Sequence, residues 1–187
     1  MTLSVLIWVL IALAILIVII FIYYFNRFVI LENRIDNSLS QIDVQLRKRA
    51  ELVPNLIETV KGYAKHEKGI MSEVTKARQA LVSAKGLQAR MKKGAELESV
   101  IGRLFAIAEN YPDLKANQNF LELQRELAAI EDKIAYARQF YNDAILTFNN
   151  SVESFPGNMF ASMYGKKEKP FLEIPKEQKV VPKVKFD

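Results

Sequence analysis

The sequence predicts an all-α protein, in which a single N-terminal transmembrane helix precedes an antiparallel three- or four-helix bundle of long, coiled-coil-like helices. Three observations support this prediction. The N-terminus is an uncharged apolar run, the rest of the chain carries apolar side chains at three–four spacing, and no segment alternates with period two for long enough to form a strand. We expect a membrane anchor over 1–26, a helical bundle over 27–165 and a Lys/Pro-rich tail over 166–187.

The predicted anchor carries no charged residue between positions 3 and 25. Twenty-three helical residues extend about 35 Å, which is enough to cross a hydrocarbon core of about 30 Å. Trp8, Tyr23 and Tyr24 lie near the two ends of the run, where amphipathic rings favour the membrane interface. A cleavable signal peptide would need a basic start and a shorter apolar core. We therefore expect the anchor to be retained.

The charges on either side of the anchor predict its orientation. The first five residues, MTLSV, contain no basic side chain, whereas Arg27, Arg34 and the run Arg47-Lys48-Arg49 follow the apolar segment. The positive-inside rule then places the N-terminus outside and the bundle in the cytoplasm, with Arg27 at the interface of the inner (plasma) membrane. The lipid bilayer is thus the first expected partner.

A long apolar stripe follows the anchor from residue 28 to residue 84 without losing phase. Only Arg49 and Glu67 interrupt its apolar character. A charge at a seam position needs a partner, because burying it alone costs several kcal/mol. Two interpretations of Arg49 stay open: it pairs with a carboxylate or carbonyl of the last long helix and fixes the register of the bundle, or its head group reaches solvent at the seam edge.

Pro54 lies inside this stripe and does not disturb its phase. We expect it to kink a continuous helix and to leave the carbonyl of Ala50 without its usual helical donor. Gly62 and Gly69 mark a second weak point, since glycine costs roughly 0.8–1 kcal/mol in a helix interior. The steady phase favours one helix as far as Ala84, and the glycines favour a turn; the pattern does not decide between them.

The second half of the body predicts a loop over 85–94, a short helix with an apolar face over 97–108 and a long helix over 120–155. Asn119 followed by Glu122 resembles a capping box that begins the long helix. A Phe-Pro-Gly sequence ends this helix. The tail from residue 166 is rich in lysine and proline, so we expect it to be extended and mobile, although Phe171-Leu172 or Val180-Val181 could dock on the bundle.

Three segments together resemble the LemA family: QIDVQLRKRAELVPNLIETVKGYAKHE, then ENYPDLKANQNFLELQRELAAIEDKIAYARQFYNDAILTFN, and finally ESFPGN. The resemblance extends from about Asn26 to Gly165. It implies a membrane-anchored antiparallel helical bundle with a cytoplasmic C-terminal domain and no established enzymatic activity. One departure is Gly157, where the family usually has a larger polar residue; we expect it to affect only the end of the helix.

The residues do not complete any catalytic or metal-binding motif. The chain has no cysteine and one histidine, His66, with Ile70 where a zinc helix needs a second histidine. Glu131 and Asp132 are interpreted as a solvated helix face. On a helix, the side chains of Arg47, Lys48 and Arg49 point in different directions. They therefore form no single basic patch and predict no nucleic-acid surface. We expect no catalytic, cofactor-binding or metal residues, and no small-molecule substrate.

The predicted function is therefore non-enzymatic: a single-pass membrane protein whose cytoplasmic bundle acts as a scaffold or adaptor. Long heptad-like seams pair between chains as well as within one, so we expect a homo-oligomer, other membrane proteins as partners, or both. The alternative is an accessory or regulator of a membrane-bound protease or an envelope-stress system. Residues Arg49, Pro54 and Glu67 are the candidates for setting bundle register.

Overall fold

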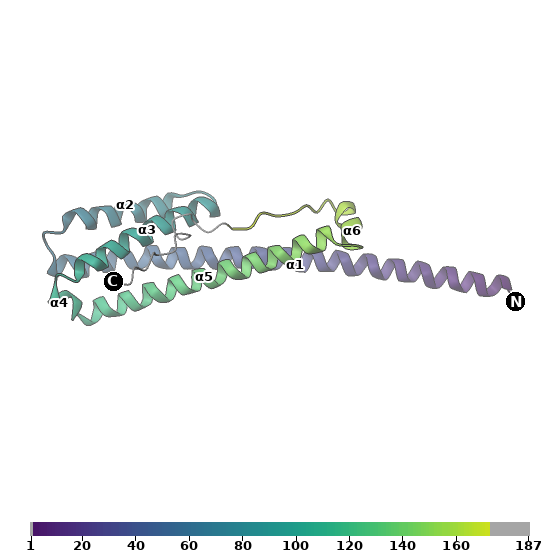
Figure 1. The fold of residues 1–187 in the computed structure, drawn as a ribbon, viewed down its shortest axis with the longest axis horizontal. Helices are drawn as coiled ribbons and strands as arrows, with labels where there is room; N and C mark the ends of the chain where they lie inside the picture. The colour runs from purple at the N-terminus through teal and green to yellow at the C-terminus, as the bar shows by residue number, and fades with distance from the viewer. Residues whose placement is uncertain (1, 173–187) are drawn as a thin grey trace, which may run out of the picture. The chain divides into compact units, whose positions relative to one another are not determined.

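The computed structural model describes residues 2–172, with side chains from residue 4 onward. The described residues form six α-helices and no strand, which confirms the predicted fold class (Figure 1). The helices are α1 (Thr2–Tyr63), α2 (Lys68–Ser83), α3 (Leu87–Ala108), α4 (Pro112–Lys115), α5 (Gln118–Glu153) and α6 (Gly157–Met163). The predicted docking segment Val180-Val181 lies outside the described residues.

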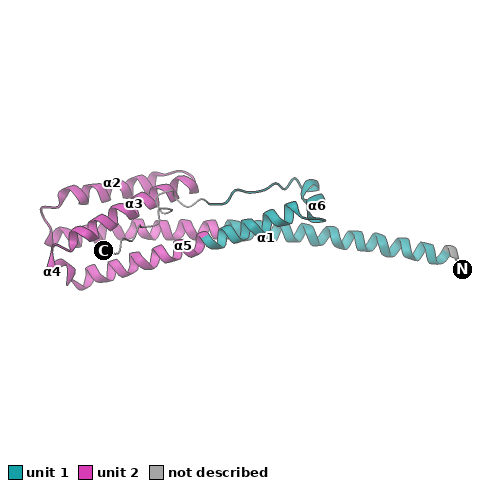
Figure 2. Ribbon diagram, viewed as in Figure 1, with its two compact units in different colours: residues 1–37, 139–187 teal, residues 38–138 magenta. Residues whose placement is uncertain are grey.

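The chain divides into two compact units, coloured separately in Figure 2. Unit 1 comprises residues 1–37 and 139–187, and unit 2 comprises residues 38–138. Helices α1 and α5 each supply residues to both units. The sequence-based boundaries after residues 26 and 165 stay a prediction.

Unit 2 is an antiparallel helical bundle formed by the last part of α1, by α2 and α3, and by the first part of α5 (Figure 1). Its connections are short, as expected for helices that pack as antiparallel neighbours. The predicted stripes supply its core, in which these side chains are at most 3% exposed: Ile42, Leu46, Val53, Leu56, Val60, Val74, Leu81, Leu97, Leu104 and Phe120. Burying these side chains is what stabilises seams that no single helix could keep out of water.

The first long stripe ends in a turn, because α1 stops at Tyr63 and α2 begins at Lys68. The two glycines therefore indicated the chain path better than the unbroken apolar phase did. Ala64 continues the last turn of α1, since its N–H donates to the carbonyl of Val60 at 2.8 Å and its side chain is 1% exposed. Glu67 occupies the N-cap position of α2, so it lies in the turn and not in a helical seam.

Two local predictions in unit 2 are wrong. The predicted loop over 85–94 shortens to the residues between α2 and α3, and Gly94 is buried inside α3. A Cβ at Gly94 would lie 2.4 Å from the Leu46 side chain, so the glycine serves close packing. The cap of α5 is Asn117 and not Asn119, because the Asn117 Oδ1 accepts a hydrogen bond of 3.0 Å from the N–H of Phe120.

Unit 1 contains the apolar first part of α1, the last part of α5, α6 and the extended residues that follow it. Phe28 and Phe148 are fully buried and meet edge to face, with ring centroids 5.9 Å apart. The predicted stripe of α5 fails at its end, because Phe155 is 80% exposed. Helix α6 has no counterpart among the predicted elements.

Residues 166–172 are extended, as predicted, but hydrogen bonds hold them against α5. The side-chain amide of Asn149 donates to the carbonyl of Lys169 and accepts from its N–H, both at 2.9 Å. Asn142 makes the same pair of bonds with Leu172, at 3.4 Å and 2.9 Å. The described part of the tail therefore follows α5, and its mobility stays a prediction.

Candidate functional site

The membrane-type part of α1 is the first candidate site. Among the described residues, α1 is the one helix long and apolar enough to cross a membrane, with a mean hydropathy of 3.6 in its most apolar window and no residue of that window buried. Trp8 is 70% exposed and Tyr23 is 55% exposed. Both side chains are free to meet lipid, and their location at the interface stays a prediction.

The other two predicted interface residues also make contacts inside unit 1. Tyr24 stacks on Phe160 of α6, with ring centroids 4.8 Å apart. Arg27 donates from Nε to the Ser151 hydroxyl at 3.1 Å and from Nη1 to the Tyr23 hydroxyl at 3.2 Å. Arg27 thus binds α5 as well as facing the end of the apolar segment.

Arg49 is the centre of a buried polar cluster in unit 2. Its side chain is 3% exposed, and its guanidinium donates to the Gly94 carbonyl at 3.2 Å. It also pairs with Glu98 of α3, at 3.5 Å, and with Glu131 of α5. A partner from this last helix was one of the two interpretations that the sequence left open, whereas Glu131 itself was interpreted as part of a solvated face. The role of the pair in fixing register stays a prediction.

The cluster holds two carboxylates for one guanidinium, and the pKa of Glu98 is raised above its ordinary value. Burial is the largest cause, and the neighbouring Glu131 carboxylate raises the pKa further. Arg49 acts in the opposite direction but does not reverse the shift. A group of this kind can take up a proton more readily in the folded bundle than in the unfolded chain.

Pro54 lies inside α1, as predicted, and α1 continues through it. The Nε–H of Arg78, on α2, donates to the Ala50 carbonyl at 2.7 Å. Arg78 therefore satisfies the carbonyl that the proline leaves without a helical donor. The sequence predicted the unsatisfied carbonyl but not the donor, because no local pattern says which arginine of a neighbouring helix will reach it.

Glu67, the third candidate for bundle register, accepts a hydrogen bond of 2.9 Å from the Tyr111 hydroxyl. This bond, together with burial and the carboxylate charge, raises the pKa of Tyr111 above its ordinary value. The contact joins the α1–α2 turn to the N-cap of α4, so Glu67 does not occupy the helical seam position expected for it.

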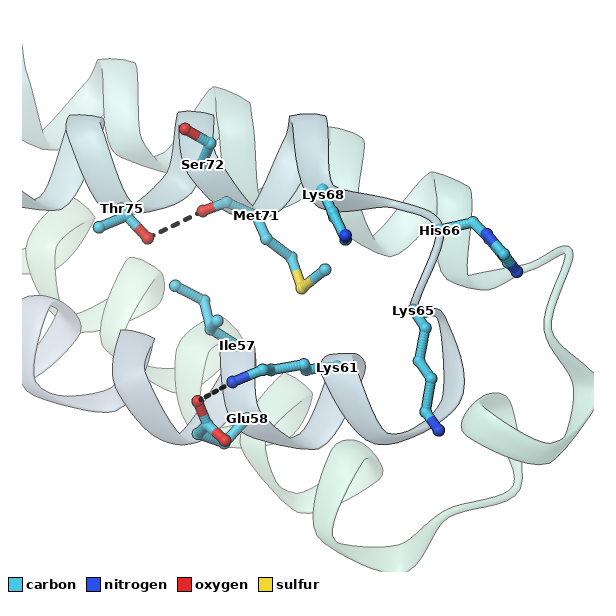
Figure 3. A pocket seen from close by; sticks show the side chains of 9 residues that line it. All are labelled: Ile57, Glu58, Lys61, Lys65, His66, Lys68, Met71, Ser72 and Thr75. Atoms are coloured by element: carbon cyan, nitrogen blue, oxygen red, sulfur yellow. Dashed lines mark hydrogen bonds and ion pairs between the residues drawn. The ribbon is translucent and has the colours of Figure 1, made fainter.

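An open groove of about 670 Å³ lies between the end of α1 and the start of α2 (Figure 3). Ile57 and Met71 point into it from the two helices, and Met71 is 8% exposed. Three lysines, Lys61, Lys65 and Lys68, surround this apolar floor, and His66 also lines the groove. The sequence pattern gave His66 no role beyond that of a failed zinc ligand and did not reveal the groove, because the two walls of the groove lie on either side of a turn that the pattern did not establish.

The charges of the groove are unequal. Glu58 is the acidic residue that lines it, and it pairs with Lys61 at 3.3 Å. Within residues 2–172, Lys65 and Lys68 form no ion pair. No group of three or more His, Cys, Asp or Glu side chains in the described part of the chain could hold a metal ion. The groove therefore combines an apolar floor with unpaired positive charge.

Comparison with known proteins identifies relatives of this fold. The model of the LemA family matches residues 38–186. Magnetosome protein MamQ 2 of Paramagnetospirillum magneticum is 26% identical over 175 residues, which cover 80% of this chain and 64% of that protein. Protein LemA of Metamycoplasma hominis is 28% identical over 133 residues, covering 70% of this chain and 60% of the relative.

The matched region thus spans less than two thirds of each of these relatives. The family match, however, covers most of the present sequence and includes all of unit 2. It also agrees with the three sequence segments that resemble the family. The chain is a member of the LemA family.

Proposed function

We propose that the protein is a non-enzymatic, membrane-tethered scaffold whose partner-binding surface is the groove between α1 and α2. The proposal depends on one observation, the combination of an apolar groove floor with lysines that form no ion pair. The floor is formed by Ile57 and Met71, and the lysines are Lys65 and Lys68. An apolar helix long enough to cross a membrane belongs to the same continuous α1 that forms one wall of this groove.

The expected occupant is an acidic amphipathic segment of another protein. Its apolar side chains would cover Ile57 and Met71, and its carboxylates would face Lys65 and Lys68. Complementary charge at the rim of an apolar contact speeds association and selects the partner, while the buried apolar centre supplies most of the affinity. Glu58 neutralises only Lys61, so the positive charge needed for this selection is available.

A crosslinking experiment in intact membranes tests the proposal. A photoreactive amino acid replaces Ser72, an exposed groove residue on α2, and in a control replaces Glu126, an exposed residue on α5. We expect capture at position 72 alone, with an acidic segment identified in the crosslinked peptide.

Charge reversal provides the second arm. Lys65→Glu with Lys68→Glu should abolish the capture, whereas Lys76→Glu with Lys85→Glu changes the net charge equally at exposed positions outside the groove and should leave it intact. Equal loss in both double variants, or equal capture at positions 72 and 126, would exclude the groove. A crosslink to a second copy of the chain would assign this surface to self-association.

We also propose that the body lies in the cytoplasm and the N-terminus outside, as the distribution of Arg27 and later basic residues predicts. A protease added to sealed right-side-out vesicles should leave unit 2 intact and should digest it once the vesicles are opened. Digestion in sealed vesicles would reverse the orientation.

A further inference from the structure

Helix α6 packs on the side of the apolar segment of α1. Phe160 stacks on Tyr24, and Tyr164 meets Phe21 edge to face with ring centroids 5.2 Å apart. The Tyr164 hydroxyl also donates to the main-chain carbonyl of Phe21 at 3.0 Å. Gly157 allows this close approach, because a Cβ there would lie 2.2 Å from the Ser151 carbonyl oxygen and 3.3 Å from the Tyr24 ring. Gly157 therefore does more than end α5, contrary to expectation.

These contacts place α6 beside residues that belong to the apolar run. Phe21 precedes Arg27, the first charged residue after the run, by six positions, which is about 9 Å along a helix. Interfacial helices bury their apolar faces about 5–10 Å into the boundary between head groups and acyl chains. The level that α6 reaches along α1 matches this depth.

One side of α6 carries exposed apolar side chains. Met159 and Met163 are 59% and 66% exposed, and Asn158 and Ser162 are the other exposed residues of the helix. Residues four positions apart in a helix lie on the same face, so the two methionines share one side of α6. Phe155, in the turn that precedes α6, is 80% exposed. No charged residue occurs between Glu153 and Lys166, so these side chains belong to a stretch of twelve uncharged residues.

We propose that α6 is a second membrane contact, an interfacial helix whose exposed Met159 and Met163, together with Phe155 in the preceding turn, insert into the lipid beside the point where α1 leaves the bilayer. Its partner is the lipid surface itself, because the exposed apolar face continues the apolar surface of α1 through the aromatic contacts with Tyr24 and Phe21. Lys167, which is exposed and follows α6, then lies near the head groups. This inference is independent of the groove and of any protein partner.

The test uses the full chain, which has no cysteine, reconstituted in vesicles of mixed zwitterionic and anionic lipid. Single cysteines at Met159 or Met163 carry a fluorophore, and quenchers are placed either on the lipid acyl chains or in the water. Ile17→Cys, in the apolar run, is the control for the lipid interior. Asp143→Cys, at an exposed charged position on α5, is the control for water.

We expect labels at positions 159 and 163 to be quenched by the lipid-borne quencher several-fold more than the label at position 143. Gly157→Leu, which should lift α6 from α1, should reduce this quenching at position 159 and leave that at position 17 unchanged. Quenching from water equal to that of the Asp143→Cys label would overturn the proposal. So would disulfide formation between cysteines at position 159 of two chains, because the face would then be covered by a second copy.

Discussion

The hydrogen bond between Arg78 and the Ala50 carbonyl gives a quantitative prediction about the proline in α1. Arg78→Ala removes a charged donor whose Nε lies 2.7 Å from an oxygen of a residue that is 4% exposed. A hydrogen bond to a charged group contributes about 1.5–3 kcal/mol, and the half-buried position of Arg78 favours the middle of that range. We therefore expect the variant to lose about 2 kcal/mol of unfolding free energy.

The same substitution in a Pro54→Ala background should cost much less. Alanine restores the main-chain N–H that donates to the Ala50 carbonyl in an ordinary helix, so that oxygen keeps a partner when Arg78 is absent. We expect the cost of Arg78→Ala to fall to about 1 kcal/mol or below, which is a coupling of at least about 1 kcal/mol between the two positions.

Denaturant unfolding of the detergent-solubilised full chain, followed by far-ultraviolet circular dichroism, measures all four members of this cycle. Arg103→Ala is the control, because Arg103 forms an exposed pair with Glu73 that should contribute less than about 1 kcal/mol. Equal costs of Arg78→Ala with and without the proline would refute the reasoning, since Arg78 would then stabilise the bundle through some other contact.

Three further variants test the polar contacts of the two units. Arg49→Leu should lower the unfolding free energy by about 2–3 kcal/mol and reduce cooperativity, because it leaves Glu98 and Glu131 without their shared cation; unchanged unfolding would exclude a register role. Burial and Glu131 raise the pKa of Glu98, so the folded chain binds the Glu98 proton more tightly than the unfolded chain does. The unfolding free energy should therefore fall as the pH rises from the ordinary pKa of a glutamate towards the raised pKa of Glu98. Glu98→Gln should flatten this slope when unfolding is measured across the acid range. Asn149→Ala removes both hydrogen bonds to Lys169 and should speed amide exchange at that residue by about tenfold, while the same measurement in α3 should not change.

Most of the fold could be predicted from apolar spacing, because burial in a helical bundle depends mainly on which side chains recur on one face. The positions of Ile42, Leu56 and Phe148 in the core follow directly from that pattern. The pattern gave no information about the turn near Gly62, because a connection of a few residues preserved the phase on both sides. It also missed α6, since seven residues are too few to establish a period.

The polar contacts were less predictable, for a different reason. Arg49 could be recognised as a charge that requires a partner, with the last long helix as one possible source, but no pattern identified Glu131 as that partner. Arg78 and Asn149 carried no sequence signal at all, because each binds a main-chain group whose availability depends on tertiary packing. A sequence can show which polar groups need a hydrogen-bond partner, but it does not show which residues will supply that partner.

The two asparagines of α5 recognise the extended C-terminal segment without reading its side chains. Asn142 and Asn149 are two helical turns apart, about 10 Å, which is also the length of three extended residues and so matches the interval from Lys169 to Leu172. Because each asparagine requires an N–H at its own position, proline is compatible with position 170 but not with positions 169 or 172. Most side chains of this segment can therefore be substituted during evolution while its path along α5 stays the same.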